Sequence, residues 1–415
     1  PAGLGQISAN TFAGCTELTS ITVDPANSVY SSVDGNLYSK DGSVLYVYAA
    51  GKPYEPFVIP ETVNRIASYA FAGSNITSVV IPETVTEIGA SAFANCENLL
   101  TVEFKNVMSV LPAGIFDGCM AITEVTLPNG LVSVGEKAFY NCRSLETIEL
   151  PDSVMSLGAY AFGYSGLTSF EVTASIGSIA EGAFAGNKIT AYSVSADNML
   201  YQTIDGNLYN KAGTNLISYA SGKAETAFVI PEGVTRIANS AFERAVNLQS
   251  VTIASTVTAI GDRAFSYCTS ITDFLVAEGN QYYYSIDGML YYWEGGSNVY
   301  VSLVAYAMGR SDTSLVLTLP KLSSSVRNLR IEEGAFAGSE LEKIYMPSFV
   351  VSVYHGAFEG WSSDQTIYYV IFYPNAGSLS WSDYSNGEID ATVIAIPEDE
   401  FPTSPETPAE GAQQP

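Results

Sequence analysis

Apolar and polar residues recur with a spacing of 22 or 23 residues from Phe71 to Phe184. One copy, residues 81–99, has the skeleton I-P-x-x-V-T-x-I-G-x-x-A-F-x-x-C-x-x-L. Its phenylalanine recurs at Phe12, Phe71, Phe93, Phe116, Phe139, Phe162, Phe184, Phe242, Phe265, Phe336 and Phe358. One copy is too short to bury its own apolar side chains, so a fixed period of this length predicts a solenoid of stacked coils.

A short alternating run follows each copy and predicts a β-strand with one buried face. In residues 145–150, Leu145, Ile148 and Leu150 are expected to point inward, with Glu149 pointing outward. Stacked coils would place such strands in parallel, about 4.8 Å apart. The predicted fold class is therefore a β-rich solenoid with repeats of about 23 residues and parallel strands on one face.

Three positions within the copy have expected local roles. A proline such as Pro82 lacks an N–H donor and suits the point where the strand leaves the sheet. The glycine of I-G, as in Gly89, is expected to serve a tight bend that other residues enter only with strain. Phenylalanines aligned in successive coils could form a continuous aromatic spine.

This pattern resembles the BspA-like class of bacterial leucine-rich repeats over roughly residues 5–372. The motif recurs with few departures, such as Thr11 and Ile115 in place of the alanine before phenylalanine. The resemblance implies a secreted or surface-displayed bacterial protein, often one involved in adhesion.

Three longer intervals interrupt the period and predict β-hairpin or meander inserts near residues 25–56, 195–227 and 277–314. Each has an Asp-Gly turn between alternating apolar runs, which is a strong hairpin signal. These turns lie at Asp34-Gly35, Asp205-Gly206 and Asp287-Gly288. Because D-G-N-L lacks the spaced oxygen ligands of a calcium loop, turn formation is the preferred interpretation.

The C-terminal part divides into a cap and a tail. The solenoid is expected to span residues 1–372, a cap residues 373–396, and a disordered, acidic, proline-rich tail residues 397–415. The chain starts at Pro1 and within a repeat, which suggests a processed form or an expressed fragment.

Charge excludes two classes of partner. The chain has 17 Lys and Arg against 43 Asp and Glu, a net charge of −26, which opposes binding to nucleic acid or to anionic lipid. No apolar run is long enough for a membrane helix, so direct membrane insertion of this chain is not expected.

Candidate chemistry is sparse, and no catalytic, cofactor or metal residues are predicted. The single histidine, His355, occupies a variable repeat position, so no base for a Ser-His-Asp or Cys-His arrangement is evident. All cysteines occupy one slot, three residues after the phenylalanine, where a small residue in a tight turn explains them: Cys15, Cys96, Cys119, Cys142 and Cys268. A straight ladder of thiols does not offer tetrahedral metal geometry.

Two sets of residues are candidates for binding a partner. Outward strand positions carry an acidic patch: Glu103, Glu124, Glu146, Glu149 and Glu171. The third insert is crowded with aromatic residues, among them Tyr282, Tyr283, Tyr291 and Trp293. Tyr and Trp are enriched at recognition surfaces, although packing of the insert onto the solenoid is the alternative explanation.

The preferred hypothesis is a non-enzymatic, extracellular or cell-surface protein that mediates protein–protein interaction or adhesion. Its partner would be a host matrix protein, another bacterial surface protein or a glycan, and a monomer is expected. One alternative is a carbohydrate-binding or carbohydrate-active protein, which requires a cleft with exposed aromatic rings beside Glu103 or Glu149. The other is a structural spacer, which requires no exposed aromatic cluster.

Overall fold

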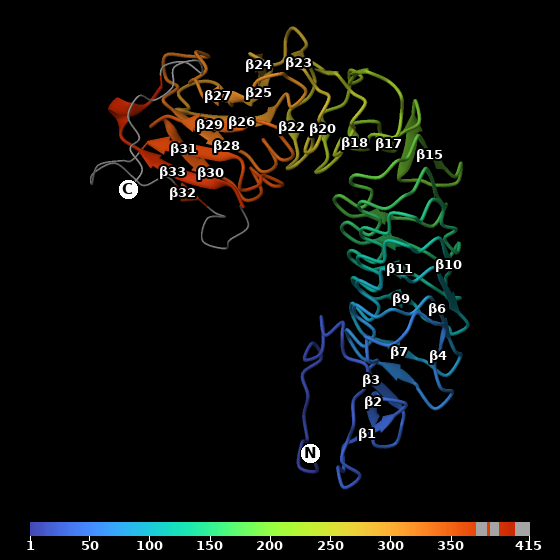
Figure 1. Cartoon of the computed structure of the whole chain (residues 1–415). Coiled ribbons are helices and arrows are strands. Elements are labelled where there is room, and N and C mark those ends of the chain that lie inside the picture. The colour runs from blue at the N-terminus through green and yellow to red at the C-terminus, as the bar shows by residue number, and fades with distance from the viewer. Residues whose placement is uncertain (371–379, 382–389, 403–415) are drawn as a thin grey trace. The chain divides into compact units, whose positions relative to one another are not determined.

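The computed structural model describes residues 1–370, 380–381 and 390–402. Residues 1–211 and 212–415 form two compact units, which are described separately. Within each unit, successive coils stack in chain order (Figure 1). Of the predicted cap, residues 373–379 and 382–389 lie outside the described residues, as do residues 403–415 of the predicted tail.

Most of the L-x-x-V-x-F segments form parallel strands, as predicted, and their pairing is called the V-x-F ladder. Residues 145–150 form no strand, so the prediction was wrong for that copy. Adjacent strands pair in register, for example Val79 with Val102 and Val102 with Val125. In residues 1–211 the strands are β4 (Phe57–Val58), β6 (Ser78–Ile81), β8 (Thr101–Phe104), β10 (Glu124–Thr126), β13 (Ser169–Val172) and β15 (Ala191–Val194). In residues 212–415 they are β19 (Ala227–Val229), β21 (Ser250–Ile253), β23 (Asp273–Val276), β27 (Ser314–Val316), β29 (Lys343–Met346), β31 (Thr366–Val370) and β33 (Thr392–Ile396).

A second parallel ladder, absent from the sequence prediction, runs through the T-x-I segments and is called the T-x-I ladder. Its strands in residues 1–211 are β5 (Arg65–Ile66), β7 (Glu87–Ile88), β9 (Val110–Leu111), β11 (Ser133–Val134), β12 (Ser156–Leu157) and β14 (Ser178–Ile179). Those in residues 212–415 are β20 (Arg236–Ile237), β22 (Ala259–Ile260), β28 (Asn328–Ile331), β30 (Val350–Val353) and β32 (Ser380–Trp381). Most of these strands have two residues, too few to show an alternating pattern in the sequence.

Three groups of strands at the long intervals add antiparallel pairing. The first group is β1 (Tyr30–Val33), β2 (Asn36–Ser39) and β3 (Val44–Val47), and the second begins with β16 (Tyr201–Ile204) and β17 (Asn207–Asn210). The third is β24 (Tyr283–Ile286), β25 (Met289–Tyr292) and β26 (Tyr300–Tyr306). Strand β3 then pairs in parallel with β5, β26 with β28, and β18 (Asn215–Ser218) with β20, so these strands continue the T-x-I ladder.

The predicted aromatic spine is present in the core. In residues 1–211, consecutive rings from Phe71 to Phe184 stack with centroid distances of 4.7 to 6.0 Å. The coils are also joined by backbone bonds, because each spine phenylalanine from Phe71 to Phe162 donates its N–H to the carbonyl of the residue before the next spine phenylalanine. Phe116 donates to the Ala138 carbonyl at 3.0 Å and Phe139 to the Ala161 carbonyl at 2.8 Å.

Tyrosines extend the spine where a long interval ends. Tyr48 stacks on Phe71 at 5.3 Å, and Tyr219 stacks on Phe242 at 5.0 Å. Each tyrosine lies 23 residues before its phenylalanine, which is the repeat period. Tyr306 likewise stacks on Phe336 at 5.4 Å. Each long interval therefore contains a coil of its own, with tyrosine in the phenylalanine slot.

The cysteine slot is a hydrogen-bond position as well as a small-residue position. The thiols of Cys96, Cys119 and Cys142 lie 2.9 to 3.2 Å from the carbonyl of the spine phenylalanine in the preceding coil. Trp361 occupies the same slot and donates its indole N–H to the Phe336 carbonyl at 3.1 Å. A donor that reaches this carbonyl therefore accounts for these cysteines and Trp361, whereas Ala245 in the same slot has only its small size.

The glycine of I-G is required by close packing and not by a bend. A Cβ on Gly89 would lie 2.2 Å from the backbone nitrogen of Ser68, and a Cβ on Gly135 would lie 2.6 Å from the Leu111 carbonyl oxygen. Neither glycine has a positive φ. The prediction of a strained bend was wrong, because the constraint comes from the backbone of the preceding coil.

The first part of the predicted disordered tail is ordered. Residues Glu398–Glu400 form a 3-10 turn, and the Phe401 ring lies edge-on to Tyr345 with 5.9 Å between centroids. The prediction of disorder from residue 397 was therefore wrong for residues 397–402. A lone phenylalanine beyond the last repeat gave no periodic signal.

We predict that Phe139→Ala destabilises residues 1–211 strongly. Phe139 is fully buried between Phe116 and Phe162, and removing such a ring costs about 3–5 kcal/mol. Urea unfolding followed by circular dichroism measures the loss. Met155→Ala is the control, because Met155 is 56% exposed and its truncation should cost less than about 0.5 kcal/mol. Equal effects of the two substitutions would contradict the spine as the main source of stability.

We also predict that only Cys15 reacts with a thiol reagent in the native chain. Cys15 is exposed, whereas the other four thiols are buried. Burial raises the pKa of Cys268 to about 12 and raises the pKa of Cys142 further, so the reactive thiolate is scarce. Titration with a chromogenic disulfide at about pH 8 should count one thiol before, and five thiols after, denaturation. Rapid native reaction of a second thiol would show that the core opens.

Candidate binding sites

The third meander is fixed to the coil before it by an asparagine. The Asn280 amide donates to the Ala254 and Val257 carbonyls at 2.8 and 3.1 Å. Its oxygen accepts from the N–H groups of Tyr282 and Tyr283 at 2.9 and 2.8 Å. Asn27 and Asn198 make the same four kinds of contact in the other two modules.

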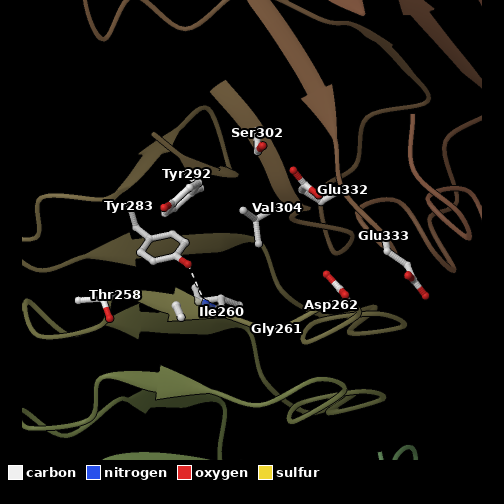
Figure 2. A pocket seen from close by; sticks show the side chains of 11 residues that line it. Thr258, Ile260, Gly261, Asp262, Tyr283, Tyr292, Ser302, Val304, Glu332 and Glu333 are labelled. Carbon is white, nitrogen blue, oxygen red and sulfur yellow. Dashed lines mark hydrogen bonds between the residues drawn. The ribbon is translucent and has the colours of Figure 1, made fainter. Parts of the chain in front are cut away.

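The tyrosine three residues later completes this attachment. The Ile260 N–H, at the edge of the T-x-I ladder, donates to the Tyr283 hydroxyl at 2.7 Å, as Figure 2 shows. Tyr201 accepts from the Ile179 N–H in the same way at 3.0 Å. A tyrosine hydroxyl therefore satisfies an edge amide that the next strand would otherwise satisfy. The signal is present in the sequence as a repeated N-x-x-Y before each Asp-Gly turn, although the predictions from periodicity overlooked it.

Two of the predicted partner-binding tyrosines belong to the core. Tyr283 is 3% exposed and Tyr291 is fully buried, so both rings pack mainly against the protein itself. Burial raises the pKa of both hydroxyls well above the ordinary value. The prediction of a partner contact is wrong for Tyr291, which has no accessible surface. It stays a prediction for Tyr283, which packs in the core but also lines the pocket described below.

Other aromatic residues of this module remain half-exposed. Tyr282 stacks on Tyr292 with 6.4 Å between centroids, and Trp293 lies 6.2 Å from Tyr284. All four are half-buried. Of the predicted aromatic contacts, Tyr282 and Trp293 therefore keep accessible surface.

A pocket opens where this meander meets the end of the T-x-I ladder. It has a volume of about 570 Å³, including space open to solvent, and is lined by residues from β22, the meander and the turn after β28. Figure 2 shows Tyr283 and Tyr292 on one side, with Asp262 and Glu332 across from them and Val304 between. Sequence patterns did not predict this pocket, because its residues come from segments far apart in the chain.

Charge in the pocket is acidic. Glu332 and Glu333 follow β28, and Asp262 follows β22. Burial raises the pKa of Glu332, and the nearby Asp262 carboxylate raises it further, against the opposing effects of a Ser302 hydrogen bond and of Arg330. Acidic groups beside phenol rings favour a cation such as an ammonium or guanidinium group.

The five predicted glutamates are exposed but do not form one row. All belong to residues 1–211, whereas the aromatic candidates belong to residues 212–415. Glu103 lies opposite Thr126, and Glu124 lies opposite Thr101. Each of these glutamates therefore has a threonine, and not another glutamate, beside it on the adjacent strand. Glu171 lies opposite Ser193, and Glu146 and Glu149 lie in residues 145–150, which form no strand. The acidic patch is therefore scattered over several coils of one face.

A groove lies beside Glu124 and Glu149, but its lining contains no aromatic residue. It is formed by residues 123–127 and 147–151. The carbohydrate hypothesis required exposed rings beside Glu103 or Glu149. That form of the hypothesis fails for Glu149, because only aliphatic, threonine, proline and glutamate side chains line the groove.

The described residues offer neither a metal-ion cluster nor a membrane helix. Across residues 1–370, 380–381 and 390–402, no group of three or more His, Cys, Asp or Glu side chains is suited to hold a metal ion. No helix of that part of the chain is long and apolar enough to cross a bilayer.

Coils with two parallel ladders and a phenylalanine spine define a leucine-rich repeat solenoid. The family model of the BspA type leucine rich repeat region matches in six copies, which together span residues 46–286 and 317–399. The chain belongs to this BspA-type leucine-rich repeat family.

Two solved structures show the same fold. A leucine rich cell surface protein from Faecalibacterium prausnitzii is 24% identical with a TM-score of 0.52, and the match covers 89% of this chain and 99% of that one. The pneumococcal vaccine antigen PcpA is 16% identical with a TM-score of 0.50, covering 91% and 100%. At these identities the likeness shows the fold alone. No curated protein sequence matches the chain.

We predict that the stability of the Glu332→Gln variant, compared with that of the wild type, increases as pH rises. Below the ordinary carboxyl pKa, Glu332 is protonated in both the folded and the unfolded chain. Between the ordinary pKa and its raised folded value, the unfolded chain ionises first, so wild-type stability falls. The difference between variant and wild type should grow as pH rises above the ordinary glutamate pKa of about 4.3, measured by urea midpoints. Glu340→Gln, at an exposed position, is the control, and a pH-independent difference would contradict the prediction.

Proposed function

We propose that this chain is a non-enzymatic protein displayed at the bacterial surface, where it binds a partner protein. Membership of the BspA-type family supports an interaction scaffold. Two structural neighbours, a cell surface protein and a vaccine antigen, agree with display at the surface. The sequence has no evident catalytic base, such as a histidine in a catalytic arrangement, and this agrees with a binding role.

The observation that carries the proposal is the pocket beside the third meander. The half-exposed Tyr292 ring supplies contact area with little loss of side-chain freedom, as aromatic residues do at other recognition surfaces. The carboxylates across from them would attract a lysine or arginine side chain of the partner. The half-exposed Tyr282 and Trp293 would extend the contact beyond the pocket.

Glycan binding is the second candidate, and the same pocket favours it. An aromatic ring can stack on a sugar ring while neighbouring carboxylates accept hydrogen bonds from the sugar hydroxyl groups. Here Tyr292 supplies the ring, and Asp262 and Glu332 supply the acceptors. A purely structural spacer would have no use for accessible aromatic residues at this place.

We predict that the purified chain captures a protein from a panel of extracellular matrix proteins at physiological salt. Substituting Asp262→Asn, Glu333→Gln and Tyr292→Ala together should weaken the captured complex by more than about tenfold, because interface aromatic and charged contacts dominate affinity. Surface plasmon resonance with the full chain provides the measurement.

The matched control carries Asp273→Asn, Glu278→Gln and Tyr300→Ala, which change the same residue types at exposed positions outside the pocket. Loss of binding in both variants would show that the pocket is not the site. Binding to a glycan array without protein capture would move the glycan candidate ahead. If the chain binds neither a matrix protein nor a glycan, the binding proposal is wrong and a structural spacer is favoured.

A further inference from the structure

The V-x-F ladder of residues 1–211 is interrupted once, between β10 and β13. Strands β4, β6, β8 and β10 form one sheet, and β13 and β15 form another. The intervening coil, residues 145–150, has the expected L-x-x-I-x-L pattern but forms no strand. The repeat is thus present in the sequence at this coil, while its pairing is absent from the structure.

The hydrogen bonds show where the ladder opens. At one repeat position, each coil donates its N–H to the coil before: Leu100 to Thr77 at 2.9 Å, Thr123 to Leu100 at 3.0 Å, Thr168 to Glu146 at 3.1 Å and Thr190 to Thr168 at 2.9 Å. The series lacks the bond from Glu146 to Thr123, and residues 147–150 make no hydrogen bond to β13 either. Among these fully described coils, no hydrogen bond joins residues 123–127 to residues 147–151.

The two coils stay together everywhere else. Ser133 pairs with Ser156 and Val134 with Leu157 in the T-x-I ladder. In the spine, Phe116 and Phe139 stack at 5.5 Å, and their coils share a backbone hydrogen bond. The opening is therefore a slot in one face of a closed core and not a separation of the coils.

The slot has an apolar floor. Its inward positions are Val125, Leu127, Ile148 and Leu150, all half-buried. The equivalent residues of neighbouring coils are covered, since Val102 is 2% exposed and Val172 is fully buried. Residues 123–127 and 147–151 line a groove of about 960 Å³, a volume that includes space open to solvent.

We propose that this slot binds an extended peptide segment of a partner protein in which basic residues alternate with apolar ones. The unpaired backbone of β10 and of residues 147–150 would accept an added strand, as exposed sheet edges do in other peptide-binding proteins. Apolar side chains of the peptide would cover the floor. Its alternate side chains would face the exposed rim, where Glu124 and Glu149 favour lysine or arginine.

Charge also excludes one competing occupant. A second copy of this chain would bring the same glutamates and a net charge of −26 to the slot, and like charges across a strand pair are destabilising. The inference rests on the proposed function, since it names the chemistry of a protein partner. It places that partner's segment on residues 1–211, whereas residues 258–333 of the other unit line the pocket.

The test uses a fluorescein-labelled Lys-Val-Lys-Val-Lys-Val-Lys peptide and the full chain, with fluorescence polarisation as the readout. We expect saturable binding that weakens as ionic strength rises. A peptide of the same sequence with N-methylated valines keeps the charge but cannot donate those backbone hydrogen bonds, and should bind at least about tenfold more weakly. Equal binding of the two peptides would mean attraction by net charge only and would overturn the proposal.

Two variants place the site. Glu124→Gln with Glu149→Gln should weaken binding about fivefold to tenfold through the lost ion pairs. Glu103→Gln with Glu171→Gln makes the same charge change on β8 and β13, outside the lining of the slot, and should have little effect. Hydrogen exchange should show new protection in residues 123–127 and 147–151 when the peptide binds. Protection elsewhere, or equal loss in both variants, would contradict a slot site.

The pocket variant separates failure of this inference from failure of the proposed function. Asp262→Asn with Glu333→Gln and Tyr292→Ala should leave peptide binding unchanged. If the peptide does not bind but matrix-protein capture still depends on the pocket, the slot inference is wrong and the proposed function stands. If the peptide binds the slot and no matrix protein is captured by the pocket, the slot inference stands and the proposed pocket does not.

Discussion

The contact between one coil and the next is the constraint on which the rest of this structure depends. At each step a phenylalanine ring stacks on its neighbour, and the backbone N–H of that phenylalanine donates to the following coil, as from Phe139 to Ala161. Both contacts require a fixed rise between coils, which explains the glycines. At Gly135 the preceding coil passes so close that a Cβ would lie 2.6 Å from a carbonyl oxygen. A single coil buries almost nothing alone, so stability depends on this repeated contact.

The meanders obey the same constraint. Each one leaves the stack as antiparallel strands and returns with a tyrosine, such as Tyr48, seated in the phenylalanine slot. The start of each meander must also satisfy a ladder edge, and Asn280 and Tyr283 do so with side-chain groups in place of a strand. These tyrosines resemble recognition residues in the sequence, but their rings are needed by the fold.

Both candidate binding sites lie where a ladder stops. The pocket opens beside β22, where Tyr283 replaces a strand, and the slot opens beside β10, where residues 147–150 fail to pair. In a continuous ladder the backbone groups are already hydrogen-bonded between strands, so a partner can contact only side chains. An interruption adds unpaired backbone, partly exposed apolar groups and carboxylates held in a concave surface, which together allow specific binding. Function in this solenoid is therefore expected at departures from the repeat.

The sequence by itself determined the solenoid, the V-x-F strands, the spine and the places of the Asp-Gly turns, because each depends on contacts one period apart that every copy repeats. It also contains the 23-residue step from Tyr48 to Phe71 and the N-x-x-Y motif, although neither entered the predictions. Only the tertiary structure decided the T-x-I ladder, the burial of Tyr291 and the pocket of Asp262, Glu332 and Tyr292. The slot beside Glu149 also could not be predicted, since its coil keeps the regular pattern. Pairing between two coils depends on their separation on one face, and the sequence of either coil alone does not set that distance.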